Sequence, residues 1–303
     1  MAGVIKPHHT HSTPYMRDTH PPPQVKPAAL YADLVREHFT RRDKPDGMLL
    51  PWAKTHGDVA LRPGEVSAWA GINGHGKSIM LGQVVLGLMA QQQRCCIASF
   101  EMKPALTLAR MCRQSSGGNA PSVEFIGRFH GWTDGRLWLY DQQGQVDPLR
   151  MLAVLRYCHE SLRMQHVVID SLMKCVRGED DYNGQKDFVD ALTSIARDTG
   201  MHIHLVHHSK KREDESRAPG KFDLKGSGSI SDQVDNVFIV WRNKKKQFDA
   251  QAGIEVDPDQ PDALLVCEKQ RNGEWEGRFA LWFHAASQQF VAGRNAGTMG
   301  FVA

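Results

Sequence analysis

Residues 71–78 read GINGHGKS and match the pattern GxxxxGK[ST] in full. In this pattern, glycines let backbone N–H groups converge on phosphate oxygens, and the helix that follows adds a partial positive charge at its N-terminus. Lys77 would reach the β- and γ-phosphates, and Ser78 would offer its hydroxyl to Mg²⁺. We therefore predict a site for ATP and Mg²⁺. Its predicted binding residues are Gly71, Asn73, Gly74, Gly76, Lys77, Ser78 and Ile79.

Two carboxylates follow apolar runs at positions where they could complete such a site. The run HVVI at 166–169 ends in Asp170, which would act with Ser78 on the metal. The run CIASF at 96–100 ends in Glu101, which could act as the general base on the attacking water. Each residue also has a structural interpretation, because acidic residues at such places often cap the next helix. The P-loop upstream favours the catalytic interpretation of both.

The elements that must position these residues alternate along the chain. Short apolar runs are separated by helical segments, the first two of which open at Lys77 and near Pro104. Runs that are apolar throughout are typical of strands buried on both faces of a parallel sheet. We predict an α/β P-loop NTPase core with a mainly parallel sheet and an antiparallel C-terminal extension. The predicted strands are 66–70, 95–100, 137–140, 167–169, 203–206, 237–241, 264–267 and 279–283.

The chain is predicted to have three parts, namely a tail at 1–27, a helix and loop at 28–50, and the ATPase domain at 51–303. The tail is rich in proline and histidine, and we interpret it as disordered rather than as a metal site, because its histidines have no fixed geometry. Over Ala28–Arg42 a helix is predicted whose apolar face either packs on its own domain or docks on a neighbouring subunit. That face carries Tyr31, Leu34, Val35 and His38.

Bulk composition excludes few classes of function. The 303 residues include 37 basic and 34 acidic side chains, so the net charge of +3 neither supports nor excludes a nucleic-acid partner. The six cysteines form no CxxC pair, which indicates a reducing compartment. The N-terminal residues lack a signal-peptide core, and no apolar run is long enough to span a bilayer. We predict a soluble cytoplasmic protein without membrane partners, or one in the host cytoplasm if its source is a virus.

Three further segments carry a family resemblance. Residues 99–102 read SFEM, residues 223–230 read DLKGSGSI with Gln233 and Asp235 after them, and residues 269–273 read KQRNG. In this order they resemble the strand end with the catalytic glutamate, the DLR-x-SGSI-x-x-x-AD stretch and the KxRxG element of the DnaB-like and Twinkle-like hexameric replicative DNA helicases. The resemblance runs from about Gly64 to about Phe283 and implies a RecA-like core of superfamily 4.

The resemblance implies roles for three more residues. Arg271 would be an arginine finger that enters the nucleotide site of the neighbouring subunit, and Lys269 would approach the same γ-phosphate. His208 would contact the γ-phosphate, as a histidine does in the Twinkle-like branch. Strand alternation allows only one of His207 and His208 to face the site, and the following lysine favours His208. The alternatives are a solvated basic hairpin end and a structural histidine.

Basic residues that follow the predicted strands are the candidate contacts to single-stranded DNA. Such contacts to the nucleic-acid backbone would be independent of base sequence and sensitive to salt. Each cluster could equally be ordinary solvated surface, but their shared position after strands favours a DNA contact for at least one of them. The candidates are Lys174, Arg177, Lys210, Lys211, Arg212, Lys244, Lys245 and Lys246.

The resemblance implies a ring-shaped homo-oligomer, expected to be a hexamer, that hydrolyses ATP between subunits and moves 5′→3′ along single-stranded DNA. Primase, polymerase or loader proteins would be its partners. No primase-like zinc ribbon stands before the P-loop, so priming activity is not expected. One alternative is a RecA- or RadA-like recombination ATPase, which the KQRNG segment disfavours. The other is an ATP-gated loader or regulatory module without unwinding activity.

Overall fold

The computed structural model describes residues 26–40, 46–178, 180–209, 218–220 and 229–302. The chain divides into two units, Met1–Lys44 and Pro45–Ala303. In the first unit a 3-10 turn, η1 (Ala28–Tyr31), leads into the helix α1 (Ala32–Thr40), within the range where the apolar spacing predicts a helix. Leu30, Leu34 and Val35 are each more than half exposed. Residues 1–25 of the predicted tail lie outside the described residues.

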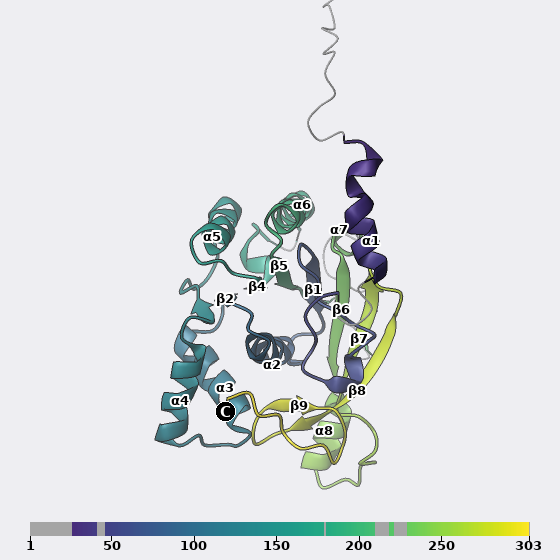
Figure 1. The fold of residues 1–303 in the computed structure, drawn as a ribbon. Helices are drawn as coiled ribbons and strands as arrows, with labels where there is room; N and C mark the ends of the chain where they lie inside the picture. Colours follow the sequence, from purple (N-terminus) through teal and green to yellow (C-terminus); the bar gives the residue numbers. More distant parts are fainter. Residues whose placement is uncertain (1–25, 41–45, 179, 210–217, 221–228, 303) are drawn as a thin grey trace, which may run out of the picture. The chain divides into compact units, whose positions relative to one another are not determined.

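The second unit contains one nine-stranded sheet in its described part, with the strand order β3-β2-β4-β5-β1-β6-β7-β8-β9 (Figure 1). Strands β1 to β6 pair in parallel, and β7, β8 and β9 extend the sheet in antiparallel register, which confirms the predicted fold class. The strands are β1 (Val66–Ala70), β2 (Cys95–Ser99), β3 (Leu137–Leu139), β4 (His166–Asp170), β5 (His202–Val206), β6 (Asn236–Arg242), β7 (Ala263–Gln270), β8 (Gly277–His284) and β9 (Gln289–Val291).

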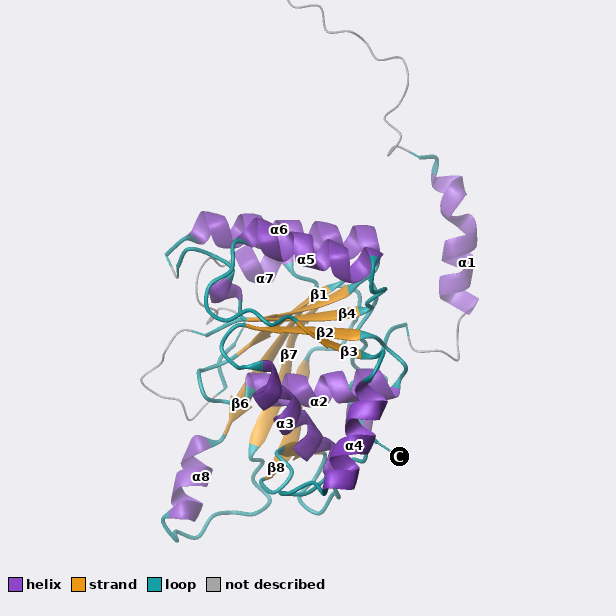
Figure 2. Ribbon diagram, turned by 90° about the vertical axis from the view of Figure 1, so that its left-hand side faces the viewer, coloured by secondary structure: helices purple, strands orange, loops and turns teal. Residues whose placement is uncertain are grey.

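Helices cover both faces of the sheet, with α2, α3 and α4 on one face and α5, α6 and α7 on the other (Figure 2). A further helix, α8, connects β6 to β7. In the part of the chain that the structure describes, no helix combines the length and apolar character that crossing a bilayer requires. The helices are α2 (Lys77–Ala90), α3 (Pro104–Ser116), α4 (Val123–Thr133), α5 (Pro148–Glu160), α6 (Tyr182–Thr199), α7 (Ser229–Gln233) and α8 (Lys244–Gln251), with 3-10 turns η2 (Ala53–Thr55) and η3 (Leu172–Lys174).

The two faces of the sheet form two apolar cores. Ala68 and Ala70 of β1 belong to the core that α5 and α6 cover, whereas Trp69 of the same strand belongs to the core around α2. Because both faces of the central strands are covered, every position along them is buried. This explains the uninterrupted apolar runs in the sequence. Strand β9 was not predicted, because its residues Gln289, Phe290 and Val291 make too short an apolar run.

Three histidines are buried side by side in the sheet. His166 Nδ1 and His204 Nε2 are 3.1 Å apart, and Trp69 Nε1 donates to His204 Nδ1 at 3.2 Å. The Ser67 hydroxyl lies 2.8 Å from His202 Nε2. Burial lowers the pKa of all three imidazoles, and that of His202 falls to about 4. Their rings are therefore neutral in the folded protein at neutral pH.

These histidines should make the fold sensitive to acid. The pKa of His202 is about 4 in the fold against an ordinary value of 6.5, so the unfolded chain binds protons that the folded chain excludes. Stability should be complete above pH 6.5 and should fall as the pH drops towards 4. Thermal unfolding followed by circular dichroism across this range should show that His202→Gln reduces the pH dependence. The exposed His130 provides the control, and an unchanged slope in His202→Gln would contradict this origin of the acid sensitivity.

Candidate nucleotide-binding site

A pocket of about 400 Å³ opens at the carboxyl ends of the parallel strands. This is the edge of an open α/β sheet where ligands bind. The pocket gathers residues from the P-loop after β1, from the ends of β2, β4 and β5, and from α3. Its lining residues are Asn73, Gly74, Gly76, Lys77, Ser78, Ile79, Glu101, Met102, Arg110, Asp170 and His208. The structure thus brings together most of the residues that the sequence predicts for this site.

The P-loop backbone depends on glycine at two of these positions. A Cβ atom at Gly71 would collide with the carbonyl oxygen of Val240 in β6, so only glycine allows the strand and loop to approach this closely. Gly74 has a φ of +79°, and a Cβ there would meet no atom within 4 Å. The backbone over Gly74 is therefore open to a ligand, as phosphate binding by main-chain N–H groups requires.

Lys77 begins α2 and is held inside the loop. Its ammonium group donates to the carbonyl oxygens of Gly71 at 2.9 Å and Ile72 at 3.1 Å. Burial lowers the pKa of Lys77 to about 8, although the carboxylates of Asp170 and Glu101 oppose this shift. A desolvated ammonium group surrounded by carbonyl oxygens would gain a strong partner from a phosphate group.

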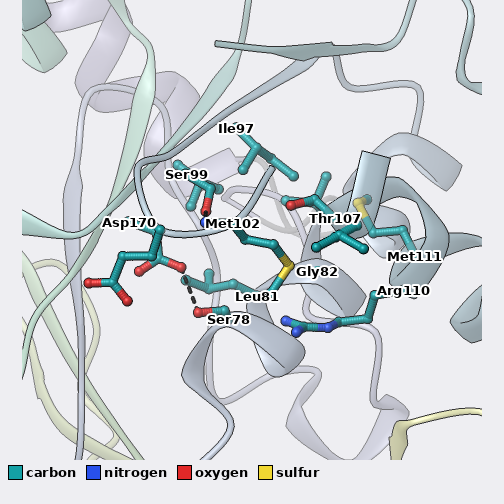
Figure 3. A pocket seen from close by; sticks show the side chains of 14 residues that line it. Ser78, Leu81, Gly82, Ile97, Ser99, Met102, Thr107, Arg110, Met111 and Asp170 are labelled. Atoms are coloured by element: carbon teal, nitrogen blue, oxygen red, sulfur yellow. Dashed lines mark hydrogen bonds between the residues drawn. The ribbon is translucent and has the colours of Figure 1, made fainter. Parts of the chain in front are cut away.

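Ser78 and Asp170 lie in contact. The Ser78 hydroxyl donates to Asp170 Oδ2 at 2.5 Å (Figure 3). Burial raises the pKa of Asp170, the hydrogen bond from Ser78 opposes this, and the neighbouring Glu101 carboxylate adds to it. A hydroxyl and a carboxylate are the hard oxygen donors that Mg²⁺ prefers. The described residues include no cluster of three or more His, Cys, Asp or Glu that could hold a metal alone, which suits an ion that retains waters and phosphate oxygens.

Glu101 lies at the mouth of the pocket, just beyond β2. Its carboxylate is 58 % exposed, and its Oε1 atom is 3.6 Å from Lys174 Nζ. Lys174, a predicted DNA contact, therefore also borders the nucleotide pocket. His208 lines the pocket, whereas His207 is fully buried. Of the two histidines after β5, it is His208 that the structure places beside the P-loop.

Arg110 was missed in the sequence analysis. It projects from α3 and lines both this pocket and an adjoining cavity of about 350 Å³, where it extends towards Ser78 (Figure 3). Its guanidinium makes no hydrogen bond or ion pair within the described part of the chain. Burial lowers its pKa, and the Asp170 carboxylate opposes that shift. The signal in the sequence was a lone arginine three to four residues from Leu106, Thr107 and Met111 on one helix face.

Lys269 and Arg271 lie at the opposite edge of the sheet from the P-loop. Lys269 pairs with Val237 at the beginning of β6, and the parallel neighbour β1 begins at the same edge. The P-loop follows the other end of β1. One chain therefore cannot place Arg271 in its own phosphate pocket, because the full length of the central strand separates them.

The candidate DNA contacts have different surroundings. Arg177 is exposed and borders a pocket of about 440 Å³ together with Asp147 and Asp181. Lys246 on α8 is engaged within its own loop, at 2.9 Å from Asp262 Oδ1 and 2.5 Å from the carbonyl oxygen of Gln260. Lys244 and Lys245 lie on the same helix. The residues Lys210, Lys211, Arg212 and the stretch 223–228 lie outside the described residues.

A P-loop after the central strand, with a carboxylate at the end of a nearby strand, defines a P-loop nucleotide-binding protein with a RecA-like core. The model of the AAA domain family matches residues 56–214, which is more than half of the chain, and the chain belongs to that family. The match includes the P-loop, Glu101, Asp170 and His208.

Among curated proteins, the chain is similar to the DNA helicase/primase of Enterobacteria phage T3, with 27% identity over 248 residues. The alignment covers 74% of this chain and 44% of that protein, so the chain spans less than half the length of this relative. Among solved structures, the fold is similar to that of a phosphate-releasing enzyme's ATPase domain, with a TM-score of 0.74 and 16% identity, and the match covers 87% of this chain and 97% of that one.

A DnaB-like replicative helicase, solved in a study of its interactions with primase, has a TM-score of 0.71 and 15% identity. The match covers 88% of this chain and 67% of the helicase chain. At these identities the two structures show a shared fold. The resemblance to DnaB-like helicases that the short motifs indicate is confirmed at that level.

Proposed function

We propose that the chain is the motor part of a DNA helicase, which hydrolyses ATP and moves 5′→3′ along single-stranded DNA as a ring-shaped homo-oligomer. The observation that carries this proposal is the single pocket that Lys77, Ser78, Glu101, Asp170 and His208 form on a fold of the DnaB type. The similarity to a phage helicase/primase supports the choice of a DNA motor over other P-loop activities.

Each pocket residue would have a separate part in the reaction. Lys77 would leave the carbonyl oxygens of the P-loop and bind the β- and γ-phosphates. Ser78 and Asp170 would hold Mg²⁺, which when bound neutralises charge on the phosphate oxygens. Glu101 would orient and deprotonate the attacking water, and His208 would contact the γ-phosphate from the end of β5.

The position of Arg271 supports catalysis between subunits. Because Arg271 and Lys269 lie a strand length from their own P-loop, a complete site needs these side chains from a second copy. The exposed apolar side chains of Leu30, Leu34 and Val35 support docking of the segment 28–50 on a neighbouring subunit, next to an ATPase domain at 51–303. We propose a hexamer, a cytoplasmic location, and primase, polymerase or loader proteins as partners.

Nucleotide binding should depend on pH through Lys77. Its pKa is about 8 without nucleotide, and phosphate oxygens favour the charged form. The affinity for ATP should be constant below pH 8 and should fall by up to about tenfold per pH unit above it, with proton uptake on binding. Calorimetric titrations in two buffers of different ionisation enthalpy would measure this uptake. Lys77→Arg is the matched control, since arginine stays charged and should remove the pH dependence.

The unwinding of a forked DNA duplex tests the proposed function. The wild-type protein should unwind the fork in the presence of ATP and Mg²⁺, and single-stranded DNA should stimulate its ATPase activity. Lys77→Ala should abolish both activities. ATPase activity without stimulation by DNA and without unwinding would instead leave the ATP-gated loader or regulatory module. Filaments in place of rings, seen by electron microscopy on single-stranded DNA, would favour the recombination ATPase.

A further inference from the structure

The Arg271 side chain is held by its own subunit. Its Nε atom lies 3.2 Å from Asp235 Oδ1. Its Nη2 atom donates to the last carbonyl oxygens around α7, those of Asp232 at 2.8 Å, Gln233 at 3.2 Å and Val234 at 3.4 Å. The C-terminal end of a helix carries a partial negative charge, so both contacts favour a cation. An exposed arginine would otherwise sample many rotamers.

Asp235 is itself fixed to the central strand. Its side chain is only 5 % exposed, and its Oδ2 atom accepts a hydrogen bond from Val66 N at 2.9 Å. The backbone N–H of Asp235 donates to Val66 O at 2.9 Å, and Arg271 N donates to Asp235 O at 2.8 Å. Val66 is the first residue of β1, the strand that leads into the P-loop. One carboxylate thus connects the guanidinium to the most rigid element of the domain.

A second buried carboxylate shares the anchoring of this turn. Glu65 accepts from Asn236 Nδ2 at 2.8 Å and from Asn272 Nδ2 at 2.7 Å. Glu65 therefore ties the start of β6 and the residue after Arg271 to the start of β1. Because Glu65 anchors the backbone of the turn, the remaining contact of Asp235, through Oδ1, acts on the direction of the Arg271 side chain.

The way in which Arg271 is held leaves one side of its guanidinium available. The Nε and Nη2 atoms are engaged, whereas Nη1 has no hydrogen-bond partner among the described residues, and the side chain is 41 % exposed. A guanidinium with two nitrogens fixed and the third facing outwards is suited to meet an oxyanion without reorganisation. From these contacts we infer that Asp235 is a positioning residue, which orients Arg271 towards the γ-phosphate held by a second copy of the chain. This inference rests on the proposed function.

Asp235→Asn tests the inference with little change of shape. The amide oxygen can still accept from Val66 N, but the amide nitrogen would then face Arg271 Nε, donor against donor. We expect kcat of the DNA-stimulated ATPase to fall by about 10- to 100-fold, as displacement of a positioned group by about 1 Å does. The KM for ATP and the assembly mass should stay within about twofold. Asp187→Asn, at an exposed carboxylate of α6, is the control and should behave as wild type.

Two further measurements separate positioning from a general loss of stability. In an Arg271→Ala background, Asp235→Asn should cause no additional loss of kcat, because the group it orients is gone. A mixture of Asp235→Asn with Lys77→Ala subunits should be more active than the sum of the two assayed alone. In mixed rings, an intact P-loop of the first protein would meet a well-oriented Arg271 of the second.

The same mixing of Arg271→Ala with Lys77→Ala subunits distinguishes the two levels of the argument. If this pair recovers activity and the Asp235→Asn pair does not, Asp235 has only a structural role and the inference is overturned. If neither pair recovers activity, catalysis between subunits is itself wrong. A rise of kcat in Asp235→Asn would also overturn the inference, because Asp235 would then restrain Arg271 in an inactive position.

Discussion

Arg271→Ala is expected to lower the ATPase kcat by about 10³- to 10⁵-fold, the range that an arginine finger contributes to phosphoryl transfer. The affinity for nucleotide should change little, because Arg271 lies at the sheet edge opposite the P-loop of its own chain. The reason for the selective effect is that negative charge spreads over the γ-phosphate oxygens only as the bond to the leaving oxygen breaks. Steady-state hydrolysis and titration with a fluorescent nucleotide would measure the two quantities on the same preparation.

The control for this variant is Arg294→Ala, which removes an exposed arginine paired only with Asp259, at 3.3 Å. It should retain wild-type turnover, since exposed ion pairs contribute little. Equal losses of binding and turnover in Arg271→Ala would contradict a residue that acts in the site of another subunit. A protein that stays monomeric under saturating nucleotide would contradict it as well.

Glu101→Gln should have the second largest effect, with kcat lower by about 10²- to 10⁴-fold, the usual contribution of a general base. Glutamine keeps the shape of the side chain but cannot accept the proton of the attacking water. Binding of ATP with Mg²⁺ should be retained or tightened, because one negative charge beside the phosphates is removed. The change also removes a carboxylate that helps to raise the pKa of Asp170, so Asp170 should ionise more readily in the variant.

Rapid-quench measurement of a single turnover would place this defect in the chemical step. Glu160→Gln, an exposed substitution at the end of α5, serves as the control. A single-turnover rate that is unaltered in Glu101→Gln would show that another group activates the water. Lys174→Ala, which removes the ammonium group 3.6 Å from Glu101 Oε1, would then become the more informative variant.

Much of the fold could be predicted from the sequence, since the covered strands carry their own signal. Strands β1, β2 and β5 need apolar side chains on both faces and are buried at every position, so they appear as uninterrupted runs. The edge strand β3 is only half-buried, and the last strand β9 has three residues. The first was predicted one residue too long, and the second was not predicted, because weaker burial imposes a weaker pattern.

The candidate site was predicted wherever backbone geometry restricts the residue type. The P-loop was recognisable because close approach to phosphate requires glycine at fixed spacing, as the contact of Gly71 with Val240 illustrates. Arg110 was not recognisable in the same way. Its role depends on how α3 packs beside α2, which brings a guanidinium from a different segment to the Ser78 and Asp170 pair.

The sequence by itself determined the alternation of strands and helices and the identity of the phosphate-binding loop, because burial and backbone conformation act on each residue locally. Only the tertiary structure decided which residues share a site. It brought His208 beside the P-loop, and it placed Arg271 a strand length away from that loop, next to Asp235. The physical reason is that sheet order and strand direction, which no local pattern encodes, set the distances between segments far apart in the chain.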